Sequence, residues 1–89
     1  MAVDPNRLQV DQITRILSAQ RIVVTGSELG PASLRVSARV ERASPVGQLF
    51  VESPRSLTQM LAGFGWSVVE TRALPDAFLL TLEKPRIGG

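Results

Sequence analysis

A strict alternation of apolar and polar side chains over residues 33–42 limits the possible fold more than any other feature of the chain. The apolar positions in this segment are Leu34, Val36, Ala38 and Val40. A period of two is typical of a strand that buries one face. A helix is the alternative, because Pro31 suits the first turn of a helix and Leu, Ala, Arg and Glu are helix formers. The local pattern favours the strand.

The rest of the chain shows helical and strand patterns that alternate along the sequence. Ile13, Ile16 and Leu17 recur at helical spacing, and Asp11 is a candidate N-cap. The expected elements are helices over 11–20 and 55–63 and strands over 21–25, 48–52, 66–72 and 77–83. We expect residues 1–10 to form a loose arm and 85–89 a flexible tail, which leaves 11–84 as a single domain.

These elements predict an α+β domain. The expected architecture is a two-layer sandwich, a four-stranded mixed sheet with helices on one face. A chain of 89 residues with 44% hydrophobic residues can build one core and has no room for a second domain. Pro75 in the turn between the last two strands predicts that they form a hairpin. The expected order after the N-terminal helix is β-α-β-α-β-β, with 33–42 as a helix, and the alternative is that 33–42 is a strand instead.

That order resembles the TusA-like (SirA) sulfur-carrier family, which places a Cys-Pro at the entrance to its first helix. The counterparts of the family motifs here are Gly30-Pro31, Pro45-Val-Gly47, Glu52-Ser-Pro54, Gly65-Trp66-Ser67 and the ending Glu83-Lys84-Pro85. The resemblance spans most of the chain from Arg21 onward and implies the family fold and a role in protein docking. It does not imply sulfur transfer, because Gly30 stands where the family has its sulfur-carrying cysteine.

The composition excludes most kinds of catalysis. The chain has no His, no Cys and no Tyr, which removes imidazole and thiol chemistry, disulfides and most metal sites. No two carboxylates stand at a spacing that demands a shared acid–base site, and the only lysine, Lys84, is close to the C-terminus. We expect no catalytic residues, no cofactor and no metal. The resulting prediction is a non-catalytic protein–protein interaction module.

A candidate interface lies in the segment Met60-Leu-Ala-Gly-Phe-Gly-Trp66. Met60, Phe64 and Trp66 are large apolar side chains grouped around two glycines, and Met and Trp are common in interfaces. The same pattern fits a helix end and strand start inside the core, which is the favoured interpretation for Phe64. Because exposed strand edges pair readily with other chains, the expected partner is another protein or a second copy in a homodimer.

The candidate contacts for an anion or RNA are Arg35, Arg39, Arg42 and Gly30. The three arginines form a stripe if the segment is helical, and Gly30 stands at the expected helix entrance. The net charge is only +2, and RNA-reading sheets usually expose aromatic rings, whereas Phe50 and Phe78 fit the core. A solvated charged face is therefore favoured, and nucleic acid is not the expected partner.

The C-terminal Gly88-Gly89 is similar to the diglycine tail at which ubiquitin-like carriers are activated, so a small carrier protein is an alternative function. The first residues lack the apolar run of a signal peptide, and no apolar run is as long as a membrane span. We expect a cytoplasmic protein without a membrane partner.

Overall fold

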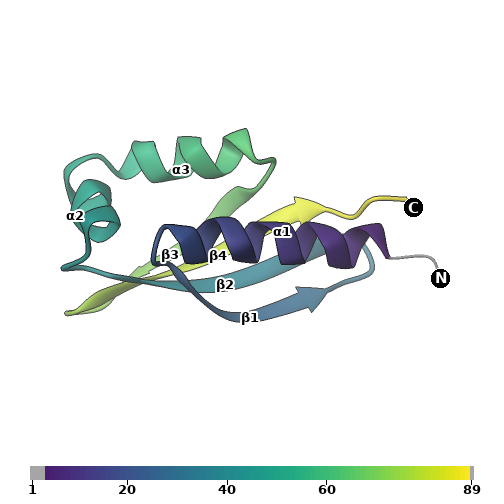
Figure 1. The fold of residues 1–89 in the computed structure, drawn as a ribbon, viewed down its shortest axis with the longest axis horizontal. Coiled ribbons are helices and arrows are strands. Elements are labelled where there is room, and N and C mark those ends of the chain that lie inside the picture. Colours follow the sequence, from purple (N-terminus) through teal and green to yellow (C-terminus); the bar gives the residue numbers. More distant parts are fainter. Residues whose placement is uncertain (1–3, 89) are drawn as a thin grey trace.

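The computed structural model describes residues 4–88, which form one antiparallel sheet covered by helices. The elements in chain order are α1 (Pro5–Ala19), β1 (Val23–Leu29), β2 (Ser33–Glu41), α2 (Pro45–Glu52), α3 (Pro54–Gly63), β3 (Ser67–Ala73) and β4 (Ala77–Pro85). The four strands lie in the order β1-β2-β4-β3, and the helices lie on one side of them (Figure 1). The predicted α+β class is confirmed. The predicted mixed sheet is wrong, because every neighbouring pair of strands is antiparallel.

Strand β2 confirms the interpretation that the alternation favoured. Its apolar side chains are at most 1% exposed and face the helices: Leu34, Val36, Ala38 and Val40. β2 pairs with β1 along one edge and with β4 along the other, so it is a central strand. The expected helix over 33–42 is wrong, and so is the order β-α-β-α-β-β that depended on it. The observed order is α-β-β-α-α-β-β.

The predicted strand over 48–52 is wrong, because these residues belong to helix α2. Ser44 is the N-cap of this helix, and its Oγ accepts a hydrogen bond from the Gly47 amide at 3.0 Å. Pro45 occupies the first helical position, where its missing N–H costs nothing. The run Leu49-Phe-Val51 has no clear period, so it cannot separate a short strand from a short helix. The cap decides the outcome.

Helix α1 begins earlier than expected, so the predicted arm is wrong for residues 5–10, while residues 1–3 lie outside the described part of the chain. Asp4 caps the helix by accepting a hydrogen bond from the Asn6 amide at 2.9 Å, and Pro5 follows it. The buried face of the helix continues back along the chain from Leu17 through Ile13 to Val10. Asp4-Pro5 is thus the true start signal, rather than Asp11.

Helices α1 and α3 end in the same way, and both endings lead directly into the core. Arg21 (φ 62°) and Gly65 (φ 86°) adopt the left-handed conformation after the last turn. The next amide, of Ile22 or Trp66, then donates to a carbonyl of the preceding turn, Leu17 or Leu61 respectively. Such an ending places the residue that follows the left-handed position against the helix. Ile22 and Trp66 are accordingly 1% and 2% exposed.

The segment after β4 is held to the rest of the molecule. Asn6, which is 3% exposed, donates from Nδ2 to the Ile87 carbonyl at 3.1 Å and accepts from the Ile87 amide at 2.7 Å. The Arg86 amide donates to the Ala32 carbonyl, and Pro85 is still part of β4. The expectation of a flexible tail from residue 85 is therefore wrong for 85–87. Its other end, Gly89, lies outside the described residues.

The core fills the space between the helices and one face of the sheet. Phe50 and Phe78 pack edge to face within it, with ring centroids 4.7 Å apart, as the prediction of core aromatics required. The opposite face of the sheet has no helix over it within residues 4–88 (Figure 1).

Candidate functional site

Strand β3 forms one edge of the sheet and leaves its outer side unpaired. It bonds to β4 only, and no group in residues 4–88 hydrogen-bonds to its outer main-chain atoms. Its sequence, Ser-Val-Val-Glu-Thr-Arg-Ala, is rich in β-branched residues and contains no Gly or Pro. Main-chain donors and acceptors along such an edge are a template for another strand.

The opposite edge is a poorer template. Strand β1 carries Gly26 in its middle, next to an irregularity in its pairing with β2. Glycine weakens a strand and often marks a bulge that ends regular pairing. β3 has one irregularity too, between Val68 and Glu70, but it runs in unbroken register with β4 from Glu70 to Ala73.

A cavity of about 400 Å³ opens beside β3, between this strand and helices α2 and α3. Its lining residues are Phe50, Pro54, Arg55, Thr58, Gln59 and Thr71. Phe50 is 8% exposed and forms an apolar floor, whereas the other lining residues are exposed and form the rim. Pro54 begins α3 with only Ser53 between it and the end of α2, and this sharp change of direction holds the rim over the edge of the sheet.

Two opposite charges on β3 face the uncovered side of the sheet. Glu70 and Arg72 pair in register with Thr81 and Leu79 of β4 and line a small hollow of about 180 Å³. No ion pair joins either of them to another residue of the described chain. By contrast, Arg39 and Glu41, which have the same spacing on β2, do bond to each other at 3.2 Å. The two β3 charges are thus available to a partner.

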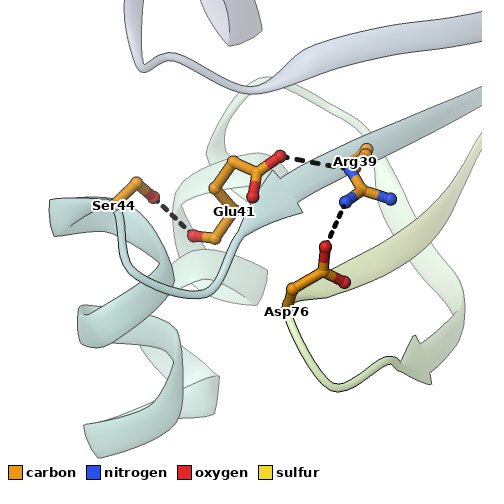
Figure 2. A network of polar contacts seen from close by, with 4 residues as sticks. All are labelled: Arg39, Glu41, Ser44 and Asp76. Carbon is orange, nitrogen blue, oxygen red and sulfur yellow. Dashed lines mark hydrogen bonds and ion pairs between the residues drawn. The ribbon is translucent and has the colours of Figure 1, made fainter.

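Five other charged side chains on or beside this face are already paired with one another: Arg35, Arg39, Glu41, Asp76 and Glu83. Arg39 Nε donates to Glu41 at 3.2 Å, and its NH2 group donates to Asp76 at 3.0 Å (Figure 2). The hydrogen bond to Glu41, supported by the nearby carboxylate of Asp76, raises the pKa of Arg39 above its ordinary value. Arg35 pairs with Glu83 at 3.1 Å.

The predicted anion contacts do not form one site. Arg35 and Arg39 lie on the uncovered face in the ion pairs just described, whereas Arg42 stacks on the ring of Phe78, 4.2 Å from its centroid. Arg42 also donates to the Leu74 carbonyl at 2.7 Å. Gly30 lies in the turn between β1 and β2, not at a helix entrance, and its carbonyl accepts a hydrogen bond from Arg86.

The predicted interface residues are divided between the core and the surface. Trp66 is 2% exposed and packs in the core, and Met60 is partly buried against this core. Phe64, by contrast, is 46% exposed. The favoured interpretation of Phe64 as core is wrong. Phe64 is the C-cap of α3, and the left-handed Gly65 after it turns the chain so that Trp66 points inward. Of these three large apolar side chains, only Phe64 is therefore largely exposed to solvent.

The diglycine tail can be followed only in part. Gly88 is exposed, and Gly89 lies outside the described residues. Ile87, directly before them, is held by Asn6.

Two further observations concern residues 4–88. No group of three or more His, Cys, Asp or Glu side chains is arranged to hold a metal ion in this part of the chain. None of its helices combines the length and the apolar character needed to cross a bilayer.

Comparisons with family models, with curated proteins and with solved structures gave no match to this chain. The function must therefore be argued from the geometry. The residues that matter most in that geometry, Glu70, Thr71 and Arg72, were not singled out from the sequence. A β-branched run without Gly or Pro was the available signal, but only the sheet order shows that this run is an edge.

Proposed function

We propose that this chain is a non-catalytic protein–protein interaction module that binds an extended polypeptide strand along β3. The observation that supports the proposal is the unpaired, β-branched edge strand beside an open cavity with an apolar floor. In this mode of recognition, main-chain hydrogen bonds provide affinity and the alternate side chains provide specificity.

The two sides of a bound strand would meet different chemistry. Side chains on the helix side would approach the cavity, where Phe50 offers apolar contact and Arg55 a positive charge. Side chains on the other side would approach Glu70 and Arg72. The proposal is independent of the TusA-like resemblance. An RNA- or anion-binding function has less support, because Arg35 and Arg39 are paired with acids and Arg42 is stacked on Phe78. A cytoplasmic location stays a prediction.

A displayed library of random peptides of about ten residues tests the proposal, with the binding site mapped from backbone amide NMR shifts. We expect the selected peptides to shift the amides of β3 and of the cavity rim. Thr71→Arg fills the cavity and should weaken binding by about tenfold or more. The matched control is Ser27→Arg, at an exposed position of β1 that lines neither the cavity nor the hollow beside β3, and it should leave binding unchanged. Selection of no peptide by a monomeric chain, or of peptides that bind elsewhere, would contradict the proposal.

A further inference from the structure

We infer that the strand bound at β3 is β3 of a second copy, so that two chains share one continuous eight-stranded sheet around a two-fold axis. The inference rests on the proposed function, because it names the occupant of the same edge. The evidence is the order of charges along β3 and the regularity of its pairing.

The symmetry restricts how β3 can pair with itself. The two strands must be antiparallel, and the two-fold axis must stand perpendicular to the sheet. Each copy then keeps its helices on the same side, and a residue of the uncovered face lies opposite a residue of that face in the partner. The axis therefore passes beside one residue of β3, and this residue fixes all the pairs.

The charges select Thr71 as that central residue. An axis beside Glu70 places two carboxylates opposite each other, and an axis beside Arg72 places two guanidinium groups opposite each other. Like charges in directly opposed positions are destabilising. An axis beside Thr71 places Glu70 opposite the partner's Arg72, and symmetry repeats this pair. Both charges lack an ion-pair partner within the described residues of their own chain, so the match satisfies four charges at once.

The irregularity in β3 supports the same register. Pairing around Thr71 uses the whole stretch from Glu70 to Ala73 that is regular against β4, and it reaches Val69, which has no partner in β4, only at its end. Val69, which is 53% exposed, then lies opposite the partner's Ala73 and loses contact with water. An axis beside Glu70 would instead extend the pairing across the irregular step between Val68 and Glu70.

The cavity adds surface on the helix side. A stable interface buries about 800 Å² on each partner, which is about one-seventh of the 5613 Å² accessible surface of this chain. Thr71 lies at the proposed axis and also lines the cavity, so the exposed rim of α3 comes together with that of the partner. We expect Arg55, Thr58 and Gln59 to supply the contact area that the strand pair does not.

Charge exchange tests this register. In sedimentation velocity, the unmodified chain should show twice its mass of 9.6 kDa. Glu70→Arg and Arg72→Glu should each weaken dimerisation by about tenfold or more, because each creates two pairs of like charges. An equal mixture of the two variants should form a heterodimer, since the introduced arginine then faces the introduced glutamate and the two unchanged charges face each other. The double variant, which carries both substitutions in one chain, should dimerise as the original chain does.

The control is Glu28→Arg on β1, the same change of charge on the other edge strand, which should leave the dimer intact. Circular dichroism of every variant should report a folded protein. A chain that stays monomeric up to about 1 mM overturns the inference. So does a dimer that Glu70→Arg leaves unchanged, or a mixture that fails to associate. A monomer that still binds library peptides at β3 overturns only this inference. A monomer that binds none overturns the proposed function as well.

Discussion

Replacing Gly47 by Ala should destabilise the protein, although the substitution favours helix formation. In an unconstrained helix interior, Ala is more stable than Gly by about 0.5–1 kcal/mol. Gly47 is buried in the first turn of α2, where an added Cβ would overlap the carbonyl oxygen of Glu41 and lie 2.9 Å from that of Arg42. The Glu41 carbonyl is fixed, because it accepts a hydrogen bond from Oγ of Ser44 (Figure 2) and another from the Ser44 amide.

The net effect follows from these two opposing terms. Overpacking a close-packed site costs about 1–3 kcal/mol, and the overlap with fixed main-chain atoms puts Gly47→Ala at the upper end. Subtracting a helix-forming gain of about 1 kcal/mol leaves a loss of about 2 kcal/mol in the free energy of unfolding. For a domain of this size, that loss lowers Tm by about 8–16 °C.

Urea and thermal unfolding followed by circular dichroism measure this loss. The matched control is Gly63→Ala at the last residue of α3, where an added Cβ has nothing within 4 Å. This control should gain about 0.5–1 kcal/mol, so the two identical substitutions should have opposite signs. A Gly47→Ala variant as stable as the original chain would refute the close approach of Gly47 in α2 to the Glu41 carbonyl at the end of β2.

Four further substitutions test the packing and the helix ends. Trp66→Ala should cost about 3–5 kcal/mol, whereas Phe64→Ala should cost about 0.5 kcal/mol, and equal losses in urea titration would contradict their opposite burial. Asn6→Ala should cost about 1–3 kcal/mol and speed amide hydrogen exchange in the C-terminal segment, because it removes two hydrogen bonds to that main chain; unchanged exchange would count against the link. Arg21→Gly should raise stability by about 0.5–1 kcal/mol in thermal unfolding, since glycine adopts a positive φ without strain. A loss would show that the Arg21 side chain stabilises the fold.

The fold was predictable from the sequence wherever one pattern acted alone. The local alternation over 33–42 favoured the strand that β2 forms, although the expected order had a helix there. The turn at Pro75 predicted the β3–β4 hairpin, which is confirmed. Two signals conflicted over residues 45–52, where an apolar run suggested a strand and Ser44-Pro45 allowed a helix cap. The cap was the better guide, because a short apolar run has no diagnostic period.

The candidate site was harder to predict, because it depends on which strand lies at an edge of the sheet. Nothing in Glu70-Thr71-Arg72 distinguishes an edge from a central strand until the order β1-β2-β4-β3 is known. The opposite burial of Phe64 and Trp66 had a local cause that could have been found in the sequence. A glycine between two aromatic residues at a helix end fits a left-handed cap, and such a cap exposes the first aromatic and buries the second.

The pairing of β2 with β4 sets how quickly this chain can reach its native state. Each of the two hairpins, β1–β2 and β3–β4, brings together residues close in sequence, but the pairs between β2 and β4 join positions 36 to 52 residues apart. Closing loops of that length costs conformational entropy before the contacts between the two strands can stabilise the chain. We expect the meeting of two locally organised halves to be the slow step, which gives folding times nearer to milliseconds than to the microseconds of helical bundles.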